Sequence, residues 1–286
     1  MKTAYLWSLL LLLPGLVLAS GRPSFKPKVE VEHRFLNSTG LQNEGGQFAF
    51  GADKIAVSNV FASVSYERWQ LNWKDVDQLP FGDGTSSPVE QMHSLRVGLR
   101  YMHRHNEKLL WLNSVGLGAT YEKEQHDSLS YSLFSMWIQQ LEDGWAISYG
   151  AAMSYHPVNT RVMPVAGFSY RMHQPNGWSG LLGYPRSYIA YGLSPQWLLS
   201  AGVVNNMIMA KLAEKSQIAA DGYGEINAWQ GDLALKYQPA THWSIETSLR
   251  YSPKYEFTVF DADGRRDATY QMEPTWGAAL GLSYQF

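Results

Sequence analysis

The sequence predicts an all-β protein in which one antiparallel sheet closes into a transmembrane barrel of about 12 strands, with roughly 10 to 14 allowed. Three observations carry this prediction. After residue 19 no stretch reaches about eighteen apolar residues, the length that a membrane-spanning helix needs. The chain nevertheless carries 11 Trp, 17 Tyr and 11 Phe. Many segments alternate between apolar and small or polar residues, as strands do when one face meets lipid and the other a lumen.

The N-terminus has the composition of a secretory signal peptide. Lys2 supplies the positive charge, residues 6–18 supply the apolar segment, and Ala19 ends a small-residue cleavage site. Pro14-Gly15 interrupts the apolar run, which argues against an anchor helix. Residues 20–28 are basic and contain proline, so that we expect a periplasmic leader here and a barrel over residues 29–286.

Composition excludes several classes of site and partner. The chain has no cysteine, which removes disulfides, thiolate metal sites and cysteine nucleophiles. Its formal net charge is −2, without a cluster of basic residues. A nucleic-acid partner is therefore not expected.

The first third of the chain has an ambiguous strand pattern. Residues 29–36 alternate well enough for a first strand, and residues 37–47 are rich in Gly and Asn and predict a loop. Residues 54–76 change parity near Glu67, which either one bulged strand or a hairpin explains. Residues 77–88 predict a loop.

The middle and the end of the chain are more regular. Residues 145–155 alternate most cleanly, with Trp145, Tyr149 and Tyr155 on the face that should meet lipid. Residues 178–193 predict one strand that is bent or bulged at Pro185, because proline removes a ladder donor. The other predicted strands lie near residues 95–104, 109–121, 128–140, 161–173, 197–209, 229–237, 243–260 and 276–286.

The final strand also carries a family resemblance. The ending GLSYQF, with Gly281, Tyr284 and Phe286, resembles the C-terminal assembly signal of bacterial outer-membrane β-barrels. This resemblance implies a place in the bacterial outer membrane, contact with its lipid and lipopolysaccharide, and recognition of the last strand by the barrel-assembly machinery. Residues 176–202 resemble more loosely the uncharacterised barrels of Gram-negative bacteria known as domains of unknown function, which brings no catalytic residues.

The resemblance also assigns the connections to the two sides of the membrane. If the last strand ends in the periplasm, the short connections at residues 157–160, 194–196 and 239–241 are periplasmic. The long connections at residues 211–224 and 261–274 are then external, as is usual for such barrels. Residues 77–88 break the rule, because they form a long loop on the periplasmic side.

Charged residues on the inner faces predict a narrow or largely filled lumen, in which pairing costs less than isolation. These predicted lumen-lining residues are Arg96, Arg100, Arg171, Asp232, Lys236, Glu246 and Arg250.

A tight turn at residues 239–241 would set the register of the hairpin that carries four of them. Tyr237 should then lie opposite Trp243. Asp232 with Arg250, and Lys236 with Glu246, would be diagonal neighbours.

Candidate catalytic groups are sparse. His156 and Ser154 share an inner face, but the side assignment places them at the periplasmic end, away from outer-leaflet lipid. His103 and His105 have metal-ligand spacing without a third ligand. Asp261, Asp263 and Asp267 lack a nearby histidine for protease chemistry. We therefore predict no catalytic, cofactor or metal site.

Two functions remain open on this sequence. The first is a barrel with a structural or small-solute transport role and no chemistry. The alternative is a membrane-embedded hydrolase that acts on outer-membrane lipid or peptide.

Overall fold

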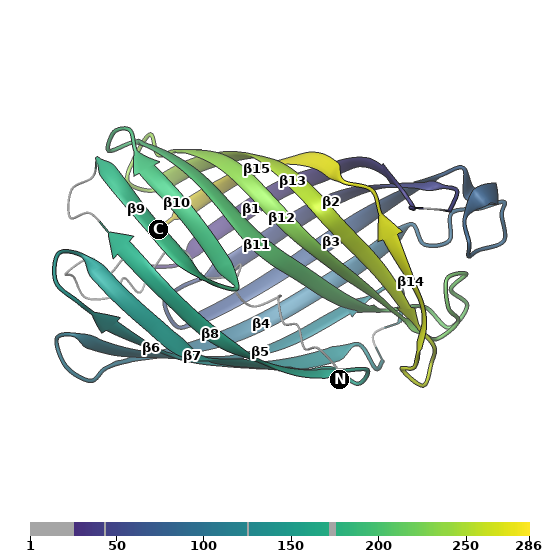
Figure 1. Cartoon of the computed structure of the whole chain (residues 1–286), viewed down its shortest axis with the longest axis horizontal. Helices are drawn as coiled ribbons and strands as arrows, with labels where there is room; N and C mark the ends of the chain where they lie inside the picture. Colours follow the sequence, from purple (N-terminus) through teal and green to yellow (C-terminus); the bar gives the residue numbers. More distant parts are fainter. Residues whose placement is uncertain (1–25, 43, 125, 172–175) are drawn as a thin grey trace.

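One antiparallel sheet winds into a closed barrel (Figure 1). The computed structural model describes residues 26–42, 44–124, 126–171 and 176–286, so the predicted signal peptide and most of the predicted leader lie outside the described residues. The first strand, β1 (Lys28–Gly40), pairs with the last, β15 (Thr275–Gln285), and this pairing closes the barrel. In the described residues no helix has both the length and the apolar composition needed to cross a bilayer.

The strands follow one another around the barrel in sequence order. A 3-10 turn, η2 (Val76–Gln78), lies in the connection after β3. The remaining strands are β2 (Gln47–Ser58), β3 (Ala62–Lys74), β4 (Gln91–Arg104), β5 (Leu109–Tyr121), β6 (Leu129–Gln140), β7 (Trp145–Tyr155), β8 (Thr160–Arg171), β9 (Gly177–Tyr184), β10 (Arg186–Gly192), β11 (Trp197–Lys211), β12 (Tyr223–Tyr237), β13 (Trp243–Phe260) and β14 (Arg266–Met272).

The barrel has 14 strands among the described residues, within the predicted range but two more than the predicted count. β14 and β15 count as one, because β13 pairs with both in a single register: Ser252 lies opposite Thr275 and Tyr255 opposite Met272. Only Glu273 and Pro274 interrupt this strand. A long loop was predicted over residues 261–274, but the structure has a short loop there, followed by β14.

The first additional strand comes from residues 54–76, where the hairpin alternative is correct. β2 and β3 pair over their whole length. Asn59 makes the turn: its side-chain oxygen accepts the backbone N–H groups of Phe61 and Ala62, both at 2.8 Å. An asparagine can replace glycine or proline as the turn former in this way.

The second additional strand comes from residues 178–193, where the prediction of one bent strand is wrong. β9 and β10 form a hairpin that turns at Pro185, with Leu181 opposite Tyr188. The Ser187 hydroxyl donates to the carbonyl oxygen of Gly183 (2.9 Å) and accepts from its N–H (3.0 Å), which holds the turn. Proline is acceptable here because the turn needs no ladder donor.

This missed turn reverses the predicted side of the connections between residues 77 and 160. We call the end of the barrel where β15 finishes the C-terminal rim and the other end the loop rim. Residues 194–196 and 239–241 lie at the C-terminal rim as predicted, whereas residues 157–160 lie at the loop rim, contrary to prediction. Residues 77–88 also lie at the loop rim, so the apparent exception disappears.

The β12–β13 hairpin forms as predicted, but its register is shifted by two residues. Tyr237 lies opposite Ile245 instead of Trp243, because the turn includes residues 238–242. A two-residue shift keeps every side chain on its predicted face. Asp232 is consequently directly opposite Arg250, and Lys236 directly opposite Glu246, instead of diagonal to them.

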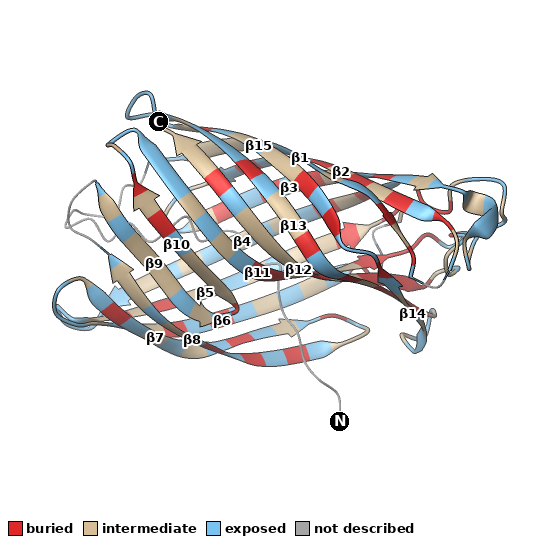
Figure 2. Cartoon of the chain, turned by 45° about the horizontal axis from the view of Figure 1, so that its top comes forward, coloured by how far each residue is buried: buried red, intermediate tan, exposed pale blue. Residues whose placement is uncertain are grey.

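The inward faces carry two apolar clusters. The larger one, the loop-rim cluster, combines residues of β2, β3, β4 and β11 to β14 with the loops that precede β4 and β12; Trp69 at its centre is completely buried. The smaller one joins inward residues of β5 to β8 with Met207 of β11. Figure 2 shows how buried and exposed positions alternate along the strands.

The β9–β10 hairpin is shorter than its neighbours. β8 pairs with β9 only from Ala166 to Arg171, and β11 pairs with β10 only up to Val204. In the described pairings, residues 160–165 and 205–211 therefore have no strand partner on the side of the hairpin, except that Lys211 bridges to Tyr121 of β5. Pro164 lies in this half-paired part of β8, where its missing N–H costs least.

A side-chain contact holds this half-paired end of β8 in place. The Arg161 guanidinium forms an ion pair with Glu225 of β12 and lies against the sulfur of Met207 on β11. Both charged side chains are about nine-tenths buried, with 10% and 9% exposure. The loop-rim end of β8 is thereby attached to the neighbouring wall by side chains instead of a backbone ladder.

Candidate functional site: a charged recess in the lumen

The inner face of β1 carries a row of charges. Its alternate residues Lys28, Glu30, Glu32 and Arg34 are half-buried, whereas Val31 and Phe35 on the other face are exposed. The row rises from the C-terminal rim to the middle of the barrel. Because a strand alternates its faces, four charges at every second position mark this side of β1 as the lumen side.

Each carboxylate next to this row has a cationic partner. The Glu30 carboxylate forms ion pairs with Lys28 at 2.7 Å and with Lys54 of β2 at 3.2 Å. The Glu32 carboxylate forms an ion pair with Arg250 of β13 at 3.1 Å. Glu67 of β3 pairs with Arg34 and also accepts the indole N–H of the buried Trp69. Such pairing lowers the cost of keeping charge in a poorly hydrated interior.

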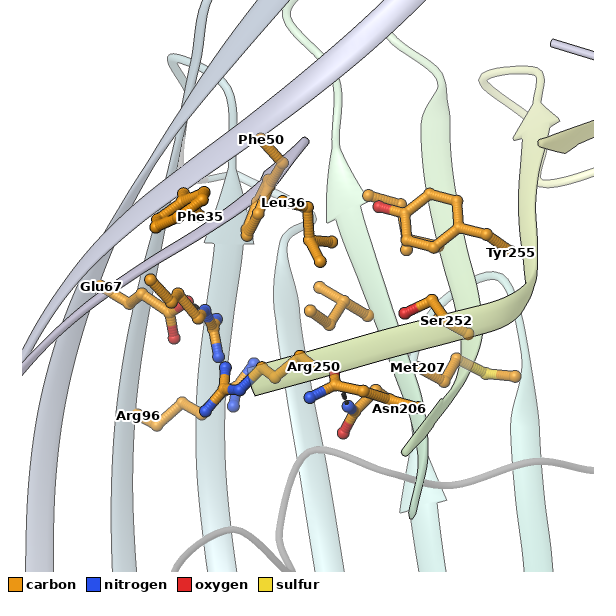
Figure 3. Close-up of a pocket in the computed structure, with 15 residues that line it drawn as sticks. Phe35, Leu36, Phe50, Glu67, Arg96, Asn206, Met207, Arg250, Ser252 and Tyr255 are labelled. Carbon is orange, nitrogen blue, oxygen red and sulfur yellow. Dashed lines mark hydrogen bonds and ion pairs between the residues drawn. The ribbon is translucent and has the colours of Figure 1, made fainter. Parts of the chain in front are cut away.

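The row ends in a recess between the walls formed by β1 to β4 and β11 to β13. The recess encloses about 740 Å³, counting the space by which it opens into the lumen. Figure 3 shows Arg96 and Arg250 on one side of it and Leu36, Phe50 and Tyr255 on the other. The recess thus has a cationic floor and an apolar roof, and the roof is part of the loop-rim cluster.

Three polar atoms of the recess are buried without a hydrogen-bond partner among the described residues. They are Nε of Arg250, Oγ of Ser252 and Oδ1 of Asn206. Asn206 uses its amide NH₂ for Gln230, at 3.1 Å. Buried polar groups in folded proteins nearly always have a partner in the protein or in ordered water, so these three atoms leave hydrogen-bonding capacity in the recess for water or a polar solute.

The predicted lumen-lining residues occupy different parts of the lumen. Arg96 and Arg250 line the recess. Arg100 is on the same face of β4 as Arg96 but nearer the C-terminal rim. Arg171 is exposed at the end of β8, at the same rim. Asp232, Lys236 and Glu246 lie on the same inward faces of the β12–β13 hairpin.

The ion pair of Arg250 is not with Asp232, its predicted diagonal neighbour, but with Glu32. Although Asp232 is opposite Arg250, the Arg250 side chain reaches across β15 to Glu32 of β1. The sequence interpretation missed Glu32, Arg34 and Glu67. The alternation of charge along residues 28–34 was an available signal for the first two.

Two loops pack on the loop-rim cluster. The loop of residues 75–90 inserts Phe81 and Val89 into the loop-rim cluster, and the loop of residues 212–222 inserts Leu212 and Ile218. We call these two loops the cap.

Gln217 joins the two loops of the cap. Its amide NH₂ donates to Asp83 at 3.1 Å and to Ser86 at 3.0 Å. Backbone N–H groups of Thr85 and Ser86 hold the pKa of Asp83 far below its usual range, so this anchor stays ionised in mildly acidic water.

The candidate catalytic histidine does not form a dyad. His156 lies at the loop rim and not at the C-terminal rim, which was predicted to be periplasmic. The argument against catalysis from its position is therefore wrong. Burial, with Arg161 and Lys211 nearby, lowers its pKa to about 4. Its Nδ1 accepts the Val158 N–H at 3.3 Å, and its Nε2 has no partner among the described residues. A base this weak is poorly matched to catalysis near neutral pH.

The other polar candidates have local roles. His103 and His105 lie at the C-terminal rim, where the His103 ring stacks on Tyr101 and the His105 ring lies edge-on to Trp137. The described residues contain no cluster of three metal-ligating side chains. Asp261 accepts the Arg265 N–H at 2.7 Å, which shapes the loop between β13 and β14.

The outer surface decides what kind of barrel this is. Large apolar side chains are exposed all around it, among them Leu99 at 56%, Leu249 at 58% and Leu280 at 55%. Such a continuous apolar surface is untenable in water and is what lipid-facing strands require. This is a transmembrane β-barrel of the outer-membrane type. Rings near the C-terminal rim, including Trp145, Trp197 and Trp243, match the aromatic girdle of such barrels.

Comparison with known proteins finds similar architectures and no related sequence. No family model and no curated protein matches the chain. Among solved structures, the KdgM porin has a TM-score of 0.42 at 9% identity, with 91% of this chain and 99% of the porin covered. An outer-membrane channel from Pseudomonas putida F1 has a TM-score of 0.46 at 10% identity, covering 93% and 97%. The toluene transporter TodX of P. putida has a TM-score of 0.41 at 9% identity, covering 92% and 91%.

The C-terminal residue gives a prediction about assembly. Phe286 is 55% exposed, packs edge-on against Tyr284 at 5.0 Å between ring centres, and donates its N–H to Pro27 at 3.0 Å. Phe286→Asp should reduce the amount of folded barrel in the membrane severalfold, because it places charge on the lipid face and alters the predicted assembly signal. The measurement is the heat-modifiable gel band of outer-membrane fractions. Phe286→Tyr is the matched control, and a normal band from Phe286→Asp would remove this role.

Proposed function

We propose that this barrel lets small solutes cross the outer membrane of a Gram-negative bacterium. One observation carries the proposal: a charged inner face, accessible at the C-terminal rim, leads to a recess beneath the cap. Glu246 and Arg171 are exposed near that rim, and Arg34 and Arg96 lie at the recess. A barrel with only a structural role would gain nothing from charges whose burial is costly.

The proposed path is narrow, because the two apolar clusters occupy part of the lumen. The loop-rim cluster lies between the recess and the cap, and the smaller cluster fills the inner face of β5 to β8. Passage past the loop-rim cluster would therefore require the cap to move. We expect small, infrequent current steps instead of the large steady conductance of an open porin.

The test is single-channel recording with the purified, refolded barrel in a planar bilayer. Wild-type protein should give small steps, and deletion of residues 80–87, which removes half of the cap, should raise the conductance severalfold. Asp263→Asn, in a loop outside the cap, is the control and should behave as wild type. Absence of current from both the wild type and the deletion variant would refute the proposal.

A membrane-embedded hydrolase remains the alternative function. The described residues at the loop rim give it no support, since His156 has a low pKa and its side chain hydrogen-bonds there only to the Val158 N–H of its own turn.

A further inference from the structure

We propose that the recess binds a small neutral molecule that has an apolar body and a carboxamide group. The inference rests on the proposed function, because such a molecule would reach the recess through the lumen. It is measured as binding, whereas the proposed function is measured as conductance. Each can therefore fail without the other.

The hydrogen-bonding capacity left in the recess consists of donors and an acceptor. Nε of Arg250 can only donate, Oγ of Ser252 can donate or accept, and Oδ1 of Asn206 can only accept. All three atoms are buried and have no hydrogen-bond partner within the part of the chain that the structure describes. Ser252 is only 1% exposed, so its hydroxyl is out of reach of bulk water. A ligand group that fits these atoms must both accept and donate hydrogen bonds.

The three atoms are brought together by Gln230 of β12. The Asn206 amide NH₂ donates to Gln230 at 3.1 Å. Gln230 itself falls at the irregularity in the β12–β13 ladder, whose other side is residues 252–253. Arg250 is two residues from Ser252 and therefore on the same face of β13. All three side chains line the recess (Figure 3), so one small group could contact them together.

The charges of the recess favour a neutral ligand over an anion. Each arginine that lines the recess already has an interaction: Arg34 pairs with Glu67, Arg250 pairs with Glu32, and Arg96 has an interaction of its own. A ligand carboxylate would have to share an arginine with a carboxylate of the protein. A buried charge without a partner of its own costs far more than a buried amide that is hydrogen-bonded.

A carboxamide satisfies all three unpartnered atoms. Its carbonyl oxygen has two lone pairs and can accept from Arg250 and from Ser252, and its NH₂ can donate to Asn206. A carboxylate of the same shape has no hydrogen to donate and would place an oxygen against the Asn206 oxygen. A ketone of the same shape could accept from the two donors but would leave the Asn206 oxygen unsatisfied.

The roof of the recess favours an apolar body next to this polar group. Leu36, Phe50, Ile226 and Tyr255 line the same space, and Phe50 and Tyr255 are 8% and 5% exposed. A sugar would leave this surface in contact with hydroxyl groups. A single ring or a short alkyl chain would cover it and exclude water, as in most pockets for small molecules, where a few polar groups fix the orientation of an apolar body.

Calorimetric titration of the refolded barrel in detergent micelles tests the inference with three probes of the same shape. These are 3-phenylpropanamide, 3-phenylpropionate at neutral pH and 4-phenylbutan-2-one, which differ only in carrying NH₂, O⁻ or CH₃ on the carbonyl carbon. Each titration is corrected by one into empty micelles. We expect the amide to bind about tenfold more tightly than the acid and about threefold more tightly than the ketone. Equal or tighter binding of the acid would overturn the preference for a neutral ligand, and equal or tighter binding of the ketone would overturn the choice of a carboxamide.

Two variants locate the site. Asn206→Leu should weaken the amide about threefold and leave the ketone unchanged, because only the amide donates to the Asn206 oxygen. Ser252→Ala should weaken the amide and the ketone alike, also about threefold, because both carbonyl groups accept from the hydroxyl.

The second variant keeps the test decisive if Asn206→Leu does not fold, since the Ser252 hydroxyl has no hydrogen bond to lose among the described residues. Ser248→Ala, a buried serine on the same strand but outside the recess, is the matched control and should bind the amide as wild type does. Unchanged binding of the amide in Ser252→Ala and in folded Asn206→Leu would show that the recess is not the site.

Discussion

Replacing Arg161 with methionine is expected to lower the free energy of unfolding by about 3–5 kcal/mol. The substitution leaves the Glu225 carboxylate, 9% exposed, without its cationic partner. It also frees the end of β8 that no backbone ladder holds on that side. A buried charge without compensation is among the costliest defects in a folded protein. The measurement is urea unfolding in lipid vesicles, followed by tryptophan fluorescence.

The double variant Arg161→Met with Glu225→Leu separates the two contributions. An apolar pair of similar size removes the unpaired charge, so most of the lost stability should return. If Arg161→Met lowers the free energy of unfolding by less than about 1 kcal/mol, water reaches the Arg161–Glu225 pair and this contact does not stabilise the barrel.

Placing an arginine on the lipid face is expected to have the next largest effect. Tyr149 lies in the middle of β7, points outward and is 47% exposed. Tyr149→Arg should cost about 2–4 kcal/mol if the position is near the bilayer midplane.

Tyr149→Leu is the matched control, since it keeps the face apolar and should cost much less. The same unfolding measurement compares the two variants. Equal stability of Tyr149→Arg and Tyr149→Leu would contradict the assignment of the odd residues of β7 to the lipid.

The fold class follows from the sequence because strand alternation is a local property. The faces of β7 and of the β12–β13 hairpin could be predicted from period two alone. The number of strands could not be predicted, since a hairpin and a bulge can both reverse the parity of the pattern. At Pro185 the outward positions change from even, as in Leu182, to odd, as in Ile189, and either a bulge or a turn explains that change.

The site was harder to predict than the fold because it depends on contacts across the barrel. Arg96 and Arg250 could be placed on inward faces from their own strands. Their convergence with Arg34 and Glu67 requires the closure of β1 onto β15 and the order of four strands, which no local pattern contains. The β12–β13 register was missed by two residues because the turn contains five residues instead of three.

The early end of the β9–β10 hairpin also limits how deeply the molecule can sink into a bilayer. Hydrocarbon offers no partner for the peptide groups along residues 160–165 and 205–211, so we infer that these segments stand above the acyl chains. Tyr184 at the hairpin tip and Trp229 on β12 are 38% and 39% exposed and suit the headgroup layer. Everything beyond that level is then a water-surrounded dome. The loop-rim cluster would be its core, stabilised by exclusion of water as in a soluble protein, whereas the belt below depends on lipid for its solvent.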